Sequence, residues 1–90
     1  MSCYSVVMYF VYVIQSELNK KLYVGFSQNP KKRLETHNSG GNVSTKSARP
    51  WILIYIEGYR DKTDAMDREK FLKTGSGKLF IKKQLKHFFL

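Results

Sequence analysis

An uninterrupted apolar run near the start of the sequence constrains the fold more than any other feature. Val6–Ile14 reads VVMYFVYVI and contains no charged side chain. Branched and aromatic residues favour strands, and apolar character at every position, rather than at alternate positions, predicts a strand that is covered on both faces. Nine residues are too few to span a bilayer. The run therefore predicts the central strand of a sheet that is covered on each side.

Two more strands and one helix follow from local signals. Leu22–Phe26 (LYVGF) predicts a second strand, joined to the first by the short polar connection Gln15–Lys21, and Trp51–Tyr59 predicts a third strand. Asn29-Pro30 is typical of a helix start, with a capping residue followed by proline in the first turn. This first helix is expected to end at Ser39–Gly41, before a polar loop that reaches Pro50.

The C-terminal third predicts two helices. Asp61 is expected to cap a helix that runs to about Lys73 and stops at Gly75. Ser76 is expected to cap the last helix, whose apolar face would consist of Ile81, Leu85, Phe88 and Phe89. The predicted order is β-β-α-β-α-α, a small α/β fold of one domain over residues 1–90. Residues 1–7 are interpreted as an N-terminal extension of that domain.

The charge balance favours nucleic acid as the partner. Sixteen Lys and Arg against seven Asp and Glu give a net charge of +9, and 14% of the residues are aromatic. Cationic side chains supply most of the sequence-independent affinity for phosphate backbones. The alternative is a basic surface that only keeps the protein soluble. The expected phosphate contacts lie in the polar loop and on the last helix: Lys46, Arg49, Lys78, Lys82, Lys83 and Lys86.

Cysteine content and the start of the sequence predict a cytoplasmic protein. A single cysteine, Cys3, excludes an internal disulfide and argues against a secreted, disulfide-rich scaffold. No basic residue precedes the apolar run, so the start of a signal peptide is missing. Two histidines and one cysteine at wide spacing also make no zinc pattern.

Several residues around the second strand and first helix could face one anion. Gly25 interrupts a strand, which often marks a place where another backbone or a ligand comes close. Arg33 and His37 are four residues apart and share a helix face, while Tyr12 and Tyr23 could lie on adjacent strands. The ordinary alternatives are core packing for the tyrosines and a solvated helix face for the Arg and His pair.

Glu69 is the most informative single residue. On a helical wheel it falls close to the apolar side that contains Ala65 and Leu72. A carboxylate beside a core needs a cation, hydrogen-bond donors or a metal ion. The alternatives are a salt bridge with its neighbour Arg68 or a place at the margin of the helix.

The order and spacing of these residues resemble the GIY-YIG nuclease family. Tyr12 stands in VYV, Tyr23 begins YVG, Arg33 follows ten residues later, and Glu69 lies on a following helix. The match extends over about residues 9–86 and is strongest to the small stand-alone, single-domain members. Their HNSG, RPW and REKFLK-type segments are similar to His37–Gly40, Arg49–Trp51 and Arg68–Lys73.

The resemblance implies a three-stranded antiparallel sheet flanked by helices and a DNA endonuclease that uses one Mg²⁺ or Mn²⁺ ion. Glu69 matches the metal ligand, Arg33 the phosphate-stabilising arginine, and Tyr12 and Tyr23 the two motif tyrosines. Either tyrosine, with Tyr12 favoured, or His37 would be the general base. The resemblance leaves RNA open as a substrate. The alternatives are a weakly active or inactive nucleic-acid-binding module, or a subunit whose protein partner supplies DNA affinity.

Overall fold

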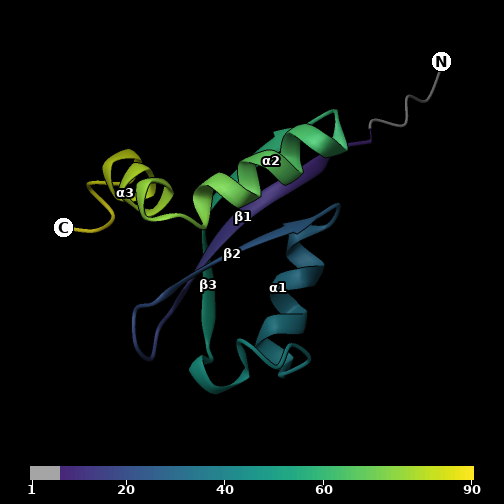
Figure 1. Ribbon diagram of the computed structural model, residues 1–90. Helices are drawn as coiled ribbons and strands as arrows, with labels where there is room; N and C mark the ends of the chain where they lie inside the picture. The colour runs from purple at the N-terminus through teal and green to yellow at the C-terminus, as the bar shows by residue number, and fades with distance from the viewer. Residues whose placement is uncertain (1–6) are drawn as a thin grey trace, which may run out of the picture.

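The computed structural model describes residues 7–90, so the predicted extension over residues 1–7 and the expected strand start at Val6 lie almost wholly outside it. Within this range the element order is β-β-α-β-α-α, as predicted (Figure 1). The elements are β1 (Tyr9–Ser16), β2 (Leu22–Ser27), α1 (Pro30–Ser39), β3 (Trp51–Tyr59), α2 (Lys62–Leu72) and α3 (Gly75–Gln84), with a short 3₁₀ helix at Lys46–Ala48 before β3.

The three strands form one antiparallel sheet in the order β2-β1-β3. The prediction that the apolar run forms the central strand is therefore confirmed. The register places Tyr12 opposite Gly25 and Ile14 opposite Tyr23. Strand β2 is an edge strand, with Leu22 on the face that α2 covers and Tyr23 on the face that α1 covers.

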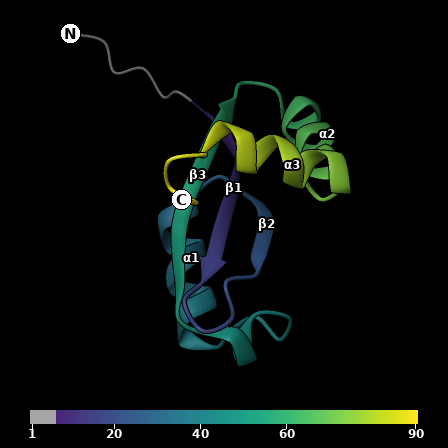
Figure 2. The same ribbon diagram turned by 90° about the vertical axis from the view of Figure 1, so that its left-hand side faces the viewer.

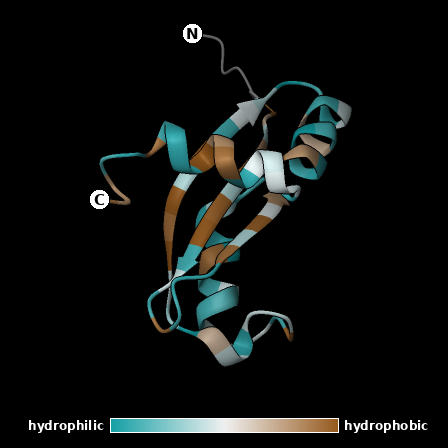
Figure 3. Ribbon diagram, turned by 60° about the vertical axis from the view of Figure 1, so that its left-hand side comes forward, coloured by the Kyte–Doolittle hydropathy of each residue, from teal (hydrophilic) through white to brown (hydrophobic). Residues whose placement is uncertain are grey.

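Helices cover both faces of the sheet. Val11, Val13 and Val24 pack with Ala65 and Leu72 of α2 and with the buried Ile81 of α3. On the opposite face, a second cluster contains Tyr12, Ile14, Ala48 and Trp51, with Leu34 of α1 against it. Figure 2 shows α1 on one side of the strands and α2 on the other, and Figure 3 shows the apolar residues concentrated in the strands between them. The full burial of both faces of β1 explains why its sequence does not alternate.

Strand β1 continues beyond the predicted end at Ile14. Gln15 pairs with Leu22, and the fully buried Ser16 pairs with Trp51. The Ser16 hydroxyl donates to the Ala48 carbonyl oxygen at 2.6 Å and accepts from two backbone N–H groups of the turn. Its polarity is thus satisfied inside the protein, which hydropathy alone does not reveal.

Both predicted ends of α3 are wrong. Thr74, not Ser76, is the N-cap, and its hydroxyl accepts from the Gly77 N–H at 3.1 Å. The helix ends at Gln84, so Lys86, Phe88 and Phe89 lie in the turns that follow. The chain leaves helical geometry at Leu85, and Phe89 folds back to pack against the core of the α2 side.

No helix within residues 7–90 is both long enough and apolar enough to cross a membrane.

Candidate active site

The centre of the candidate site is a hydrogen bond between Tyr12 of β1 and His37 of α1. Both side chains are buried, and the Tyr12 hydroxyl lies 2.8 Å from His37 Nε2. Gly25 makes room for the tyrosine, because a Cβ atom at this position would overlap the end of the Tyr12 ring. A group does approach Gly25 closely, but it is the side chain of Tyr12 and not the backbone or ligand that the glycine predicted.

A second hydrogen bond holds the other side of the imidazole. His37 Nδ1 lies 2.8 Å from Thr45 Oγ1, which in turn lies 3.4 Å from the Asn42 carbonyl oxygen. In the tautomer that carries its proton on Nδ1, His37 donates to Thr45 and its Nε2 is free to accept from the Tyr12 hydroxyl. Burial and the Arg33 guanidinium both lower the pKa of His37, so its imidazole is neutral at neutral pH.

The loop that carries Thr45 is tied to α1 and β3. Asn38 exchanges two hydrogen bonds with the backbone of Trp51, at 2.7 and 2.9 Å. The Trp51 indole N–H donates to the Thr45 carbonyl oxygen at 2.8 Å. The HNSG-like and RPW-like segments thus hold Thr45 behind His37. Sequence reasoning missed Thr45, because a lone threonine in a polar loop carries no recognisable pattern.

Arg33 and Tyr23 border the same pair. Arg33 lies one turn before His37 on α1, and Tyr23 on β2 places its ring edge-on to the imidazole, with the ring centres 5.0 Å apart. Burial raises the pKa of the Tyr12 hydroxyl and the Arg33 guanidinium opposes this rise, while Tyr23 and Glu69 add to it. All three residues therefore act electrostatically on one hydroxyl.

Glu69 comes from α2, on the other layer of the fold. Its side chain is 22% exposed, and it belongs to the same helical stripe as the buried Ala65 and Leu72. The alternative of a salt bridge to Arg68 is wrong, because Arg68 binds Glu57 of β3 at 2.8 Å. Glu69 instead pairs with Lys73, one turn later, at 3.2 Å. Since Lys73 is more than half exposed, this pair is weak and leaves the carboxylate available to a stronger cation.

The donor set suits a hydrated metal ion and not a closed metal cage. No cluster of three or more His, Cys, Asp or Glu side chains occurs within residues 7–90. Mg²⁺ commonly keeps several waters and binds through one or two carboxylates together with substrate phosphate oxygens. Glu69, as a single half-buried carboxylate, fits this mode. A structural zinc site, which needs four protein ligands, does not fit.

The predicted basic residues fall into two groups. Lys46 and Arg49 lie on the loop beside α1, where the Arg49 Nε–H donates to the Lys46 carbonyl oxygen at 2.8 Å. Lys78, Lys82 and Lys83 lie on α3, and Lys86 follows that helix. All six side chains are exposed, but they do not form one patch, because the loop and α3 pack on opposite faces of the sheet.

Comparison with known proteins agrees with this arrangement. Residues 8–84 match the model of the GIY-YIG catalytic domain. A UPF0213 protein of Staphylococcus haemolyticus is 41% identical over 69 residues, which cover 76% of this chain and 83% of the relative. A UPF0213 protein of Staphylococcus aureus strain Mu50 is 39% identical over 67 residues, 73% of this chain and 80% of the relative. The match implies a nuclease-like domain with a nucleic-acid substrate, and the chain belongs to the GIY-YIG family.

Proposed function

We propose that this protein is a DNA endonuclease that hydrolyses phosphodiester bonds with one divalent metal ion, Mg²⁺ or Mn²⁺. The observation that carries the proposal is the buried hydrogen bond of 2.8 Å from the Tyr12 hydroxyl to the neutral His37. Three further groups with the right chemistry, Arg33, Tyr23 and Glu69, act on the same hydroxyl. A buried tyrosine that served only packing would need one hydrogen-bond partner for its hydroxyl, and His37 alone supplies it. Arg33, Tyr23 and Glu69 go beyond that need.

In the proposed reaction, Tyr12 is the general base. It takes a proton from the attacking water while its own proton moves to His37 Nε2, and Thr45 keeps the imidazole in the tautomer that can accept it. The relay avoids a free phenolate, which only about one tyrosine in a thousand forms at pH 7. The water oxygen bonds to phosphorus as the bond from phosphorus to the leaving oxygen breaks, and solvent protonates that oxygen. The proton held by His37 then returns to solvent through the Tyr12 hydroxyl, which restores the site.

Arg33 and Glu69 complete the proposed site. The Arg33 guanidinium donates charge-assisted hydrogen bonds to the scissile phosphate and stabilises the charge that grows on its oxygens. Glu69 holds the metal ion. When bound, a divalent ion supplies Lewis-acid stabilisation of the phosphate and of the leaving oxygen.

Tyr23 is the alternative general base, because its side chain is less buried than that of Tyr12. Tyr12 is only 1% exposed, whereas Tyr23 is half-buried and more accessible to water. Both nitrogens of the His37 imidazole already bond to Tyr12 and Thr45, which argues against direct contact between the imidazole and the attacking water. Nicking by Tyr12→Phe and Tyr23→Phe separates the two bases. If Tyr12 is the base, Tyr12→Phe causes the larger loss, of about 10²–10⁴-fold in rate.

A plasmid-nicking assay with Mg²⁺ tests the activity itself. We expect the wild type to nick and Glu69→Ala to lose nicking, while gel-shift affinity in EDTA stays within about twofold. Asp67→Ala is the matched control, because Asp67 is an exposed carboxylate of the same helix, and we expect it to nick at the wild-type rate.

Two other outcomes would favour the alternatives. A wild type that binds DNA but never nicks, with Mg²⁺ or Mn²⁺, would make this chain a binding module. A wild type that nicks only after a protein partner is added would make it a subunit that depends on that partner for DNA affinity.

A further inference from the structure

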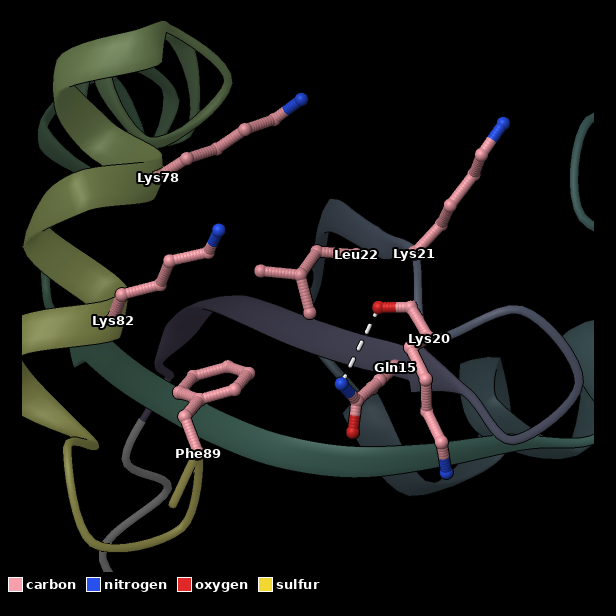
Figure 4. A pocket seen from close by; sticks show the side chains of 7 residues that line it. All are labelled: Gln15, Lys20, Lys21, Leu22, Lys78, Lys82 and Phe89. Atoms are coloured by element: carbon pink, nitrogen blue, oxygen red, sulfur yellow. Dashed lines mark hydrogen bonds between the residues drawn. The ribbon is translucent and has the colours of Figure 1, made fainter.

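A basic cavity lies away from Tyr12 and His37, on the opposite face of the sheet. It has a volume of about 570 Å³ and opens between the β1–β2 turn and α3. Its lining residues are Gln15, Lys20, Lys21, Leu22, Lys78, Lys82 and Phe89. In Figure 4 the side chains of Lys78 and Lys82 extend from α3 beside the same space that Leu22 and Phe89 border. Leu22 and Phe89 also pack against the core of the α2 side, which places the cavity on that face of the sheet.

The cavity concentrates positive charge without compensation. Four of its seven lining residues are lysines, and none is acidic. Within residues 7–90, neither of the two ion pairs involves any of these lysines. Four like charges around one concavity repel one another, so an anion that enters gains from all of them at once.

The floor of the cavity is apolar and partly aromatic, which a site for a simple anion would not need. Phe89 and Leu22 are half-buried there, while the Gln15 amide nitrogen is held by the Lys20 carbonyl oxygen at 3.3 Å. A second cavity of about 510 Å³ shares Gln15, Lys20 and Phe89 with the first. It adds Phe88, which is 49% exposed and whose ring centre lies 5.1 Å from that of Phe89. It also adds Glu17, the one acidic side chain in the lining of the two cavities.

The two cavities together form a groove with a lysine rim and an aromatic floor. Lysines suit a phosphate backbone, and exposed aromatic rings suit the faces of unpaired bases. Duplex DNA keeps its base faces stacked inside and cannot use such a floor. We propose that this groove binds a single-stranded segment of the nucleic-acid substrate, with its phosphates at the lysines and a base stacked on Phe89.

The position of the groove links it to the candidate active site across one strand edge. Leu22 and Tyr23 are successive residues of the edge strand β2, so their side chains point to opposite faces. Leu22 lines the groove and Tyr23 borders His37. An unpaired nucleic-acid strand that crosses the free edge of β2 would pass from the groove to Tyr23 and the candidate active site. The role of this binding in substrate cleavage rests on the proposed nuclease function, but the binding itself does not.

Fluorescence anisotropy in EDTA tests the groove independently of catalysis. The probes are a labelled oligo-dT strand and a labelled duplex of the same length, at one fixed salt concentration. Counterion release alone favours the duplex, because its charge density is higher. Stacking of a base on Phe89 is open only to the single strand, so we expect the wild type to bind the single strand more tightly than the duplex. Equal or tighter binding of the duplex would overturn the proposal.

Variants of Phe89 and Lys82 locate the binding. Phe89→Leu keeps an apolar side chain but removes the stacking face, and we expect it to weaken single-strand binding by at least about fivefold with little change for the duplex. Phe89→Tyr should retain the affinity. Lys82→Ala should weaken binding more than Lys83→Ala, a matched control from the same helix that does not line the groove.

Each remaining outcome of this experiment is decisive. Unchanged single-strand affinity of Phe89→Leu, with a wild-type melting temperature, would reduce the groove to a site for simple anions and overturn the proposal. Binding of an oligo-U RNA strand more tightly than oligo-dT, with the same sensitivity to Phe89→Leu, would support it and assign RNA as the strand. Single-strand binding by a wild type that never nicks would refute the nuclease function and leave the groove intact.

Discussion

Single residues decide the chemistry of this protein through buried polar side chains. Tyr12, Ser16, His37 and Thr45 are all buried, and each makes side-chain hydrogen bonds. Within residues 7–90, no buried side-chain nitrogen or oxygen lacks a partner. A fully satisfied buried network is rigid, whereas one missing partner leaves a costly unpaired group. The positions of Tyr12 and His37 thus depend on their buried surroundings, on Gly25 for the ring of Tyr12 and on Thr45 for His37.

Thr45 is expected to be a positioning residue for His37. Thr45→Val keeps the volume but removes the hydroxyl that bonds to His37 Nδ1, so the imidazole loses the partner that orients it. We expect nicking to fall about tenfold and the free energy of unfolding to fall by about 1–2 kcal/mol, measured by single-turnover nicking and urea denaturation. Thr36→Val is the control, because the Thr36 hydroxyl bonds only an exposed backbone carbonyl of its own helix. Equal effects of both substitutions would remove Thr45 from the site.

Glu57 predicts how stability responds to acid. Burial would raise its pKa, but hydrogen bonds from Arg68, Tyr55 and Tyr59 outweigh burial and lower it from 4.5 to about 2. Because the folded pKa lies below the unfolded one, the contribution of Glu57 is complete above pH 4.5 and is lost as the pH falls towards 2. Glu57→Gln should therefore lower the free energy of unfolding at pH 7 by on the order of 2 kcal/mol.

Chemical denaturation of wild type and Glu57→Gln at several pH values checks this expectation. The difference between the two proteins should shrink steadily below pH 4.5. A difference that stays constant from pH 7 to pH 3 would mean that ionisation of Glu57 does not stabilise the fold.

At the scale of elements, local patterns predicted the order and most of the ends, including both ends of β3 and α1, but failed at the ends of β1 and α3. The central place of β1 follows from apolar residues on both of its faces, and the start of α1 follows from Asn29, whose side chain does cap the helix. The ends of β1 and α3 depend on tertiary contacts. Ser16 can be buried because its hydroxyl donates a hydrogen bond to the carbonyl oxygen of Ala48, far along the chain. Helix α3 stops shortly before Phe89, which folds back on the core. No local pattern carries that information.

The cap of α3 offers a direct test at this scale. Thr74→Ala removes the hydroxyl that accepts from the Gly77 N–H, so we expect thermal or urea denaturation to report a loss of about 1 kcal/mol in the free energy of unfolding. Ser76, the residue that local pattern favoured, is exposed inside the helix, and Ser76→Ala should leave stability unchanged or slightly raised. A larger loss for Ser76→Ala than for Thr74→Ala would contradict the assigned cap.

At the scale of the whole molecule, the layers of the fold unite residues that the sequence separates. Tyr12, Arg33 and His37 lie on the α1 side, and Glu69 belongs to α2 in the other layer. The order of these residues predicts one shared site only through the family resemblance, which supplies the topology. The groove was not predictable, since Lys20 and Lys21 of one turn meet Lys78 and Phe89 only in the folded protein. Spacing along the sequence cannot express a contact between such distant segments.

The central claim is that Tyr12 and Glu69, from two layers of the fold, work as one catalytic unit. The most direct test compares the rates of single-turnover nicking by Tyr12→Phe, Glu69→Gln and the double variant. Residues that act as a unit lose most of their joint effect with the first substitution. We predict that the double variant nicks within about tenfold of the slower single variant. A double variant whose loss equals the product of the two single losses would contradict the account.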